Sequence, residues 1–582
     1  MTKTPRPEHP KPQMRRDDWE NLNGAWEFET DMSNSGMDRR LWEKEPFDRI
    51  ITVPFCPESR LSGVGFTDFM PALWYRKTVS VPAEKLSGRV LLHFGAVDYF
   101  SRVWVNGSEA GTHSGGYSSF SFDITKFLSA GDNSITVYAY DDNRRGRQPS
   151  GKQSALYQSH GCHYTRTTGI WQTVWLEYTP LNYIKSARIT PDVANRAVCI
   201  EAELSCRGEF LFKAEASFRG ARQGEASVLV SGSHARLAVA LEELFLWDAG
   251  VPNLYDLKLT LTGRTPGGPP RDEVTSYFGM RSVDWDGRAI RINGRPLFLR
   301  LVLDQGFYPD GIYTAPTDEA LINDIRLSME LGMNGTRLHE KVFEERFLYH
   351  ADRMGYLVWG EHANWGLDAD RPEGLLHFLP EWMEVLERDY NHPSIIGWCP
   401  FNETWDRGSS QPGEPGVLYG VYKVTKLYDK TRPVIDTSGY YHVITDIYDT
   451  HDYRQDAAAF AESYRDLKPG EIYDPKPDTQ AYGGQPFFVS EYGGMRWQTD
   501  GGGGWGYSSP DSEEELVARY EALTNALTQC EAVCAFCYTQ LYDTEQECNG
   551  LYTYAREKKF SDAAYERIKA ATRREAAIEK NE

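Results

Sequence analysis

The second half of the chain alternates short apolar runs with helical patterns, and this alternation limits the possible folds more than any other feature. From residue 279 onward, segments such as DEALINDIRLSMELG have the spacing of amphipathic helices. Eight such units in about 300 residues predict a (β/α)8 barrel over residues 279–582. The eight candidate strands are PLFLRLVLDQG, GMNGTRLH, YLVWGEH, IIGWCPFNE, RPVIDTS, ITDIYDTHDY, PFFVSEYGG and VCAFCYTQLYD.

The first half contains short strand patterns separated by turn residues. WYRKTVSV, RVLLHFGAV, SRVWVNG and NSITVYAY are rich in β-branched and aromatic residues, so residues 1–180 are expected to form a jelly-roll β-sandwich. Residues 181–278 carry a second set of alternating segments, in about the length of an immunoglobulin-like β-sandwich. A polar stretch, residues 141–166, is too long for a plain connection, so we expect it to reach over the barrel mouth.

Charge and cysteine content exclude several classes of protein. The 582 residues carry a net charge of −21 with the acidic residues spread along the chain, so a nucleic-acid partner is not expected. No leader-like segment and no apolar run of ~20 residues occurs, which predicts a cytoplasmic protein without a membrane partner. The nine cysteines follow no repeated spacing and suit reduced thiols.

Two predicted barrel strands end in a carboxylate after an apolar run. Glu403 ends IIGWCPFNE and Glu491 ends PFFVSEYGG. Catalytic groups of such barrels lie at the carboxyl ends of the strands, so the two side chains are expected to meet at one mouth. A pair of carboxyl groups is the minimal equipment for cleaving a glycosidic bond. The alternative is that each glutamate caps a helix or pairs with an arginine on the rim.

The segments RDYNHPSIIGWCPFNET, FFVSEYGG, RINGRPLFLRLV and TTGIWQTVWLE together resemble glycoside hydrolase family two, which includes β-galactosidases, β-glucuronidases and β-mannosidases. The resemblance covers nearly the whole chain. It implies a retaining, exo-acting glycosidase that works by double displacement on a glycoside or oligosaccharide. Glu403 matches the family's acid/base and Glu491 its nucleophile, while Asn402 is suited to bind the sugar 2-hydroxyl. Arg337 would keep Glu491 ionised, and His339 would face the sugar.

Further binding candidates follow from their positions near strand ends or in the polar loop. Aromatic side chains could stack on the sugar, although aromatic residues in such folds more often belong to the core. The loop contributes Lys152, Gln153 and His163 as contact candidates. The predicted substrate-binding residues are Asn402, Arg337, His339, His362, Trp365, His451, Tyr453, Tyr492, Tyr538 and Arg166.

Other classes of function have weaker signals. Cys530, Cys534 and Cys537 have the spacing of a radical iron–sulfur motif, but they lie too late in the barrel pattern and suit small core residues. No nucleotide-binding loop or HExxH motif occurs, so neither a cofactor nor a metal is expected. A non-catalytic carbohydrate-binding protein would be expected to lack one of the two glutamates. The resemblance leaves a homo-oligomer open.

The identity of the sugar depends on one segment near the end of the chain. The family's glucuronidases bind the substrate carboxylate through an Asn-x-Lys motif, and this chain has Glu547, Cys548 and Asn549 there. An acidic residue at that place would repel a uronic acid, although Lys558 or Lys559 could replace the missing cation. We therefore expect a neutral sugar, with a β-galactoside first. The alternatives are a β-glucuronide, a β-glucoside or an α-L-arabinoside.

Overall fold

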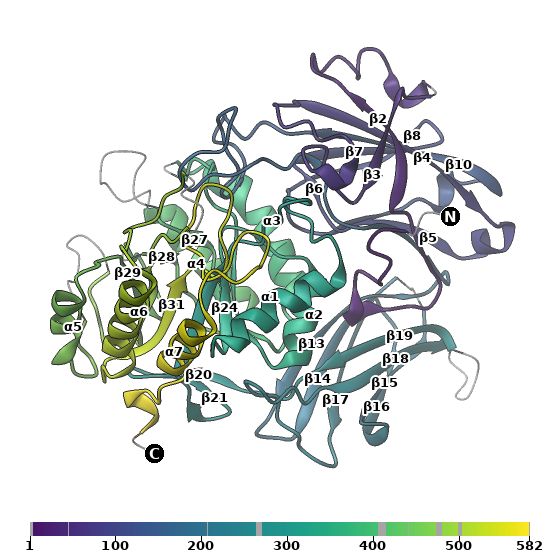
Figure 1. Cartoon of the computed structure of the whole chain (residues 1–582). Helices are drawn as coiled ribbons and strands as arrows, with labels where there is room; N and C mark the ends of the chain where they lie inside the picture. Colours follow the sequence, from purple (N-terminus) through teal and green to yellow (C-terminus); the bar gives the residue numbers. More distant parts are fainter. Residues whose placement is uncertain are drawn as a thin grey trace.

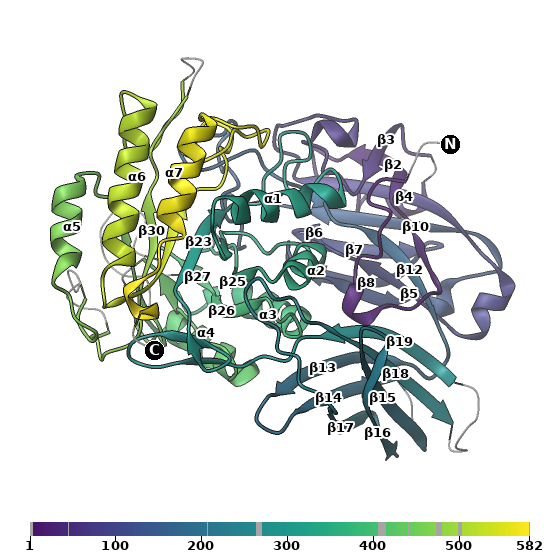
Figure 2. The same ribbon diagram turned by 60° about the horizontal axis from the view of Figure 1, so that its bottom comes forward.

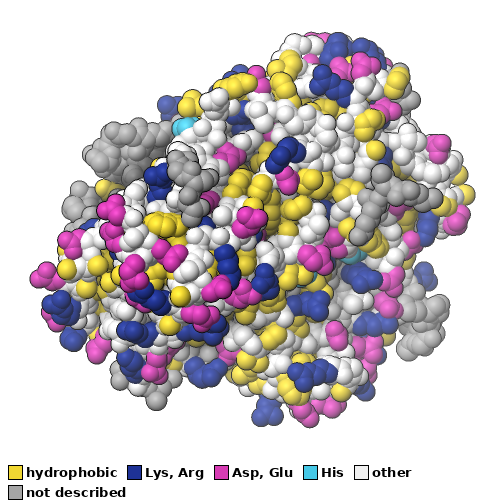
Figure 3. All heavy atoms as spheres, in the orientation of Figure 1, with side chains coloured by type: hydrophobic (Ala, Val, Ile, Leu, Met, Phe, Trp, Pro, Cys, Tyr) yellow, Lys and Arg dark blue, Asp and Glu magenta, His cyan; other side chains and the backbone are white. Residues whose placement is uncertain are grey.

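The computed structural model describes residues 4–44, 46–205, 208–263, 270–369, 371–404, 415–439, 441–472, 480–498 and 503–580. Two β-sandwiches lie on one side of the molecule and the barrel lies on the other (Figure 1). Figure 2 shows the same arrangement after rotation, with the second sandwich below the first. Acidic and basic side chains are interspersed over the face in Figure 3.

The first sandwich packs a four-stranded sheet against a six-stranded sheet around a core of aliphatic and aromatic side chains. The longest pair, β4 and β10, runs antiparallel over ten residues each. The four-stranded sheet has the order β1 (Trp19–Asn21), β12 (Val174–Thr179), β5 (Arg89–Phe94) and β9 (Phe120–Asp123). The six-stranded sheet has the order β3 (Arg49–Val53), β2 (Gly24–Thr30), β4 (Ala72–Val81), β10 (Gly131–Tyr140), β7 (Phe100–Val105) and β8 (Ser108–Ser114), and a short pair joins β6 (Val97–Asp98) to β11 (Gly169–Ile170).

The second sandwich also consists of two antiparallel sheets around its own core. In FLFKAEASF, the sequence of β15, every second residue is buried, the pattern of a strand with one face on a core. One sheet has the order β13 (Ile184–Asp192), β14 (Ala197–Leu204) and β17 (His234–Ala240). The other has the order β16 (Ala221–Val230), β15 (Phe210–Phe218), β18 (Tyr255–Gly263) and β19 (Pro270–Phe278).

A small sheet of β20 (Val283–Trp285), β21 (Ile290–Ile292) and β22 (Arg295–Pro296) leads into the barrel. Seven parallel strands form one sheet in the order β26-β25-β24-β23-β31-β30-β29. In the sequence, the short parallel pair β27–β28 comes between β26 and β29, the two edge strands of that sheet. Each predicted strand segment contains at least one of these strands, and IIGWCPFNE contains both β26 and β27, so the predicted barrel is confirmed. The strands are β23 (Leu299–Asp304), β24 (Gly335–Leu338), β25 (Leu357–Glu361), β26 (Ile395–Cys399), β27 (Phe401–Asn402), β28 (Thr437–Ser438), β29 (Tyr448–Asp452), β30 (Phe487–Gly493) and β31 (Val533–Thr539).

The barrel helices lie outside these strands (Figure 1). Helix α6 shows why they form where they do: the Ser512 hydroxyl accepts a hydrogen bond from the Glu515 amide, and three glutamates occupy the first turn. Strands β30 and β31 are buried at every position, as expected for parallel strands covered on both faces. The helices are α1 (Asp318–Glu330), α2 (Glu345–Met354), α3 (Gly374–Asp389), α4 (Pro415–Tyr428), α5 (Ala457–Arg465), α6 (Glu513–Thr528) and α7 (Asp562–Thr572).

Two further observations concern the predicted iron–sulfur spacing and membrane-spanning helices. Cys530, Cys534 and Cys537 are buried in the barrel core among apolar side chains, and the cysteines in the described part of the chain are free thiols. No helix within the described ranges combines the length and the apolar character needed to cross a lipid bilayer.

Candidate active site

The carboxyl ends of the barrel strands bring Glu403 and Glu491 together. Glu491 lies in β30, Glu403 directly follows β27, and His451 lies in β29. One oxygen of each carboxylate and one nitrogen of the imidazole all lie within 4.8 Å of one another. Glu491 is buried, whereas 23% of the Glu403 side chain is exposed. The strand-end prediction for the two glutamates therefore matches their placement.

His451 bridges the two carboxylates. Its Nδ1 lies 2.7 Å from Glu403 Oε1, and its Nε2 lies 3.5 Å from Glu491 Oε1. Burial alone would lower the pKa of His451, but the charge of Glu491 and the hydrogen bond with Glu403 outweigh burial and raise it. The two carboxylates therefore favour the protonated form of the imidazole. An imidazolium has no lone pair free for a metal ion, so the spacing of these three groups is better suited to proton and charge chemistry.

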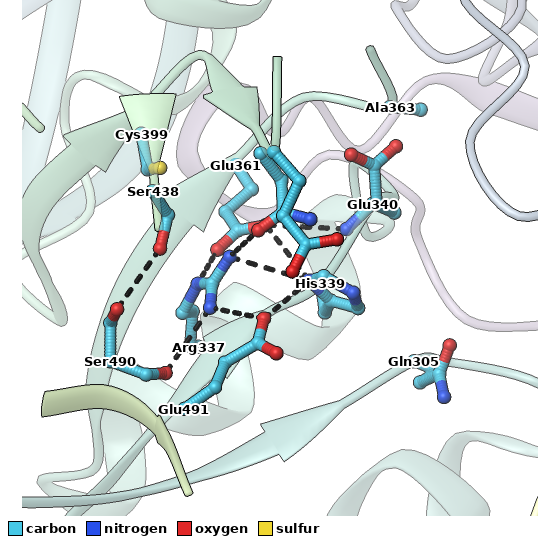
Figure 4. A network of polar contacts seen from close by, with 12 residues as sticks. Gln305, Arg337, His339, Glu340, Glu361, Ala363, Cys399, Ser438, Ser490 and Glu491 are labelled. Carbon is cyan, nitrogen blue, oxygen red and sulfur yellow. Dashed lines mark hydrogen bonds and ion pairs between the residues drawn. The ribbon is translucent and has the colours of Figure 1, made fainter. Parts of the chain in front are cut away.

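Arg337, at the end of β24, fixes Glu491 from the other side (Figure 4). Its Nη1 donates to Glu491 Oε1 at 2.8 Å, its Nη2 donates to Asn402 Oδ1 at 2.6 Å, and its Nε donates to Glu361. Burial would raise the pKa of Glu491, but the cations His451 and Arg337, together with a hydrogen bond donated by the Tyr453 hydroxyl, lower it. Glu491 is therefore kept ionised, as the resemblance implied for Arg337.

Asn402 and Glu403 share a constrained turn. Glu403 has a φ of +47°, a left-handed conformation that costs about 1 kcal/mol or more for a non-glycine residue. Its amide donates to the Ser438 carbonyl at 2.9 Å, and the Trp365 indole donates to the Asn402 carbonyl at 3.1 Å. Within the described residues, the buried Nδ2 of Asn402 has no hydrogen-bond partner. This amide is thus free to donate to a bound molecule.

Several other predicted residues lie at the same cluster. His339 Nδ1 lies 3.3 Å from Glu361 and 4.0 Å from Glu491, and burial lowers the pKa of His339, so it is neutral. The Tyr453 ring stacks on Tyr507 with 3.4 Å between ring centroids. Trp365 joins the cluster through Asn402, as described above.

Four predicted binding residues point elsewhere, and those predictions are corrected. His362 is fully buried against Phe378 and Trp382. The Tyr492 hydroxyl lies 2.8 Å from Thr524 on α6, and the Tyr538 ring packs against Tyr520 on the same helix. Each is a core residue because neighbours along a strand point to opposite faces. The fourth residue, Arg166, donates hydrogen bonds to the carbonyls of Ser154 and Leu156, among others, and so holds its own loop.

The polar loop of residues 141–166 extends from the first sandwich onto the barrel. The Ser150 amide donates to the Trp365 carbonyl at 2.8 Å, and the Tyr164 hydroxyl donates to Glu547. The Trp505 indole donates to the Gly161 carbonyl at 2.5 Å. Of its contact candidates, His163 lies beside Trp365, with 5.3 Å between ring centroids, whereas Gln153 hydrogen bonds Asp98 within the sandwich.

Sequence reasoning missed Glu361 and Tyr507. Glu361 ends the apolar strand LVWGE, which is the same signal that singled out Glu403 and Glu491. It binds Arg337 and accepts a hydrogen bond from the Glu340 amide, so it positions the cation that contacts Glu491. Tyr507 follows a glycine-rich segment without periodic pattern, and nothing in the sequence marked it.

Comparison with known proteins assigns nearly the whole chain to one family. Three family models match: the sugar-binding domain of glycosyl hydrolases family 2 over residues 19–180, a further domain of that family over 182–281 and its TIM barrel domain over 287–555. The human β-glucuronidase is 27% identical over 454 residues, 71% of this chain and 67% of that protein. The Paenibacillus borealis β-glucuronidase is 26% identical over 413 residues, 66% and 67% of the two proteins.

Solved structures show the same fold. A Bifidobacterium dentium β-glucuronidase complexed with coumarin-3-O-glucuronide superposes with a TM-score of 0.80 at 18% identity, covering 97% of this chain and 99% of that one. The Ruminococcus gnavus β-glucuronidase gives a TM-score of 0.77 at 19% identity, covering 96% and 99%. The matched domains span nearly the whole sequence in the family's order, so this chain belongs to glycoside hydrolase family 2 and is a glycoside hydrolase.

Proposed function

We propose that this glycoside hydrolase is exo-acting and retaining, with Glu491 as nucleophile and Glu403 as acid/base. The observation that carries the proposal is the separation of the two carboxylates, whose nearest described oxygens lie within 4.8 Å of one another. Retaining enzymes place their carboxyl groups about 5–5.5 Å apart, whereas inverting enzymes need about 6.5–9.5 Å for a water molecule between them. The loop of residues 141–166, docked over the barrel, supports a closed pocket for one terminal sugar.

The reaction then has two steps. Glu491 attacks the anomeric carbon while Glu403 gives its proton to the leaving oxygen, which forms a glycosyl-enzyme ester and releases the aglycone. Glu403, now a carboxylate, takes a proton from water, and that water breaks the ester with retention of configuration. The charge of Arg337 and the Tyr453 hydroxyl keep the nucleophile ionised before attack. The free Nδ2 of Asn402 is available for the sugar 2-hydroxyl, a contact that strengthens in the transition state.

For the sugar, we propose a β-glucuronide. The curated relatives reported above carry the name β-glucuronidase, which favours this alternative over the β-galactoside that we expected from the sequence. A neutral glycoside is the second candidate, and one observation favours it: Glu547, at the place of the family's carboxylate-binding motif, is 2% exposed and accepts a hydrogen bond from Tyr164 of the loop.

A panel of nitrophenyl glycosides tests both parts. Wild-type protein is incubated with the β-glucuronide, β-galactoside, β-glucoside and α-L-arabinoside, and kcat/KM is compared. A glucuronide preferred by tenfold or more, about 1.4 kcal/mol in transition-state binding, supports the proposed sugar. NMR of the first-formed anomer tests the mechanism, because inversion would overturn it. Absence of cleavage on all four substrates would overturn the proposed sugar.

A further inference from the structure

The loop from the first sandwich carries a mostly buried lysine, Lys152, whose cation has no hydrogen-bond or ion-pair partner among the described residues. The residue is 7% exposed, and its Nζ lies 5.5 Å from the ring centroid of Trp365. Within the part of the chain that the structure describes, its Nζ makes neither a hydrogen bond nor an ion pair, and its contact is the Trp365 ring. A cation on a mostly buried side chain without a hydrogen-bond acceptor is costly unless solvent or a ligand reaches it, so such a group is suited to serve a ligand or a nearby charge.

The position of Lys152 is set by the backbone on both sides. Gly151 donates to the carbonyls of Ala363 and Trp365, and the Lys152 carbonyl accepts from the Tyr164 amide at 2.7 Å. Gly151 has a φ of +56°, and a Cβ on it would lie 2.2 Å from the Glu340 carbonyl oxygen. Only glycine therefore lets the loop approach the barrel this closely, and the approach delivers Lys152 to the active site.

Three carboxylates act on this lysine from beyond ion-pair distance. Burial lowers the pKa of Lys152, but the negative charges of Glu547, Glu491 and Glu403 outweigh burial and raise it, so the side chain is a cation. Glu547 is itself occupied, because its oxygens accept hydrogen bonds from the Tyr164 hydroxyl and from Asn549 Nδ2. These donors reduce the repulsion that Glu547 exerts on a bound anion.

The two lysines that the sequence offered as replacements are engaged elsewhere. Lys558 Nζ pairs with Asp562 at 2.5 Å on the surface. Lys559 Nζ pairs with Asp543 at 2.7 Å and donates to the Cys548 carbonyl at 3.2 Å. Neither is free to bind a substrate, whereas Lys152 is.

We propose that Lys152 binds the carboxylate of the terminal uronic acid, so that a loop of the first sandwich selects the sugar cleaved in the barrel. This inference rests on the proposed glucuronide specificity. The competing explanation is that Lys152 only balances the charge of the three carboxylates. The two differ in one measurable respect: a carboxylate-binding lysine affects acidic substrates selectively, whereas a charge-balancing lysine affects every substrate alike.

The experiment compares wild-type protein with Lys152→Gln and Lys152→Arg on nitrophenyl β-glucuronide and β-galactoside. Lys152→Gln should lower kcat/KM for the glucuronide about 10- to 100-fold, the range for losing a hydrogen bond to a charged group, and change the galactoside value less than about threefold. Lys152→Arg keeps the charge and should retain the glucuronide preference. The surface variant Lys558→Gln is the matched control and should leave the substrate ratio unchanged.

The outcomes separate the two proposals. If wild-type protein prefers the galactoside, the proposed sugar fails and the role of Lys152 fails with it. If wild-type protein prefers the glucuronide but Lys152→Gln loses activity equally on both substrates, the glucuronide proposal stands and the role of Lys152 is overturned. Should Lys152→Gln not fold, Lys152→Met takes its place: a loss confined to the glucuronide supports the role, and an equal loss on both substrates overturns it.

Discussion

Replacing Arg337 by methionine removes the cation that contacts the proposed nucleophile while nearly keeping the side-chain length. In the native protein the guanidinium is 1% exposed and donates to Glu491, Glu361 and Asn402. An opposite charge within 4–6 Å lowers a carboxyl pKa by about 1–3 units, so Arg337→Met should raise the pKa of Glu491 by up to that amount. His451 and the Tyr453 hydroxyl remain and limit the shift.

Two consequences follow, one for the rate and one for stability. The acid limb of the kcat/KM profile should move upward by about 1–3 pH units, and below that limb each unit costs about tenfold in rate. Two buried carboxylates lose their partner, which should cost about 3–5 kcal/mol in the free energy of unfolding. Because the native pKa of Glu491 is lowered, its contribution to stability is present above the unfolded value near 4.3 and is lost as the pH falls through the native value.

The assay is kcat/KM of the best nitrophenyl glycoside against pH, with urea unfolding of each variant in parallel. Arg432→Met is the matched control, because Arg432 is 3% exposed and pairs with Asp429 at 2.6 Å within the barrel but away from the carboxylate pair. It should lose comparable stability without moving the acid limb. An acid limb of Arg337→Met that coincides with the wild-type limb would refute the reasoning that Arg337 keeps Glu491 ionised.

Three further predictions concern the carboxylates and the histidine between them. Glu491→Gln should abolish turnover and leave folding intact. A 2-fluoro glycoside should label the wild-type peptide that contains Glu491, and a label on another residue would refute the assignment of the nucleophile. Glu403→Ala should lower kcat/KM about 10²–10⁴-fold for substrates with poor leaving groups but much less for dinitrophenyl glycosides, and added azide should restore turnover. Equal losses on both kinds of substrate, without rescue by azide, would count against Glu403 as the acid/base. His451 has a raised pKa, so its stabilising charge is complete below about pH 6.5 and is lost as the pH rises through the native value. The stability difference between wild type and His451→Gln, measured by urea unfolding, should therefore shrink from acid to alkaline pH, and a constant difference contradicts this.

Local sequence patterns were sufficient to predict the barrel and the position of Glu403 and Glu491 at its strand ends. Parallel barrel strands are buried on both faces, so their sequences are short apolar runs. A charged residue at the end of such a run is therefore easy to identify. The same rule applies to Glu361, which was overlooked although it ends LVWGE.

The alternation of side chains between the two faces of a strand could also have corrected the assignments of His362 and Tyr492. Because Glu361 and Glu491 face the barrel interior, His362 and Tyr492, the next residues, must face the helices. The structure places them against Phe378 and Trp382 on α3 and against Thr524 on α6, respectively. This information was local, and sequence reasoning did not use it.

The placement of Lys152 was decided only by the tertiary structure. The sequence marked residues 141–166 as functional because they are polar and long, but it did not distinguish Lys152, which lies beside Trp365 of the barrel, from Arg166, which holds the loop together. The bonds from Gly151 to Ala363 and Trp365 join residues more than 200 positions apart. Strand patterns follow from the neighbours of each residue, whereas the docking of a loop on another domain depends on hydrogen bonds and close approaches that only the folded chain brings together.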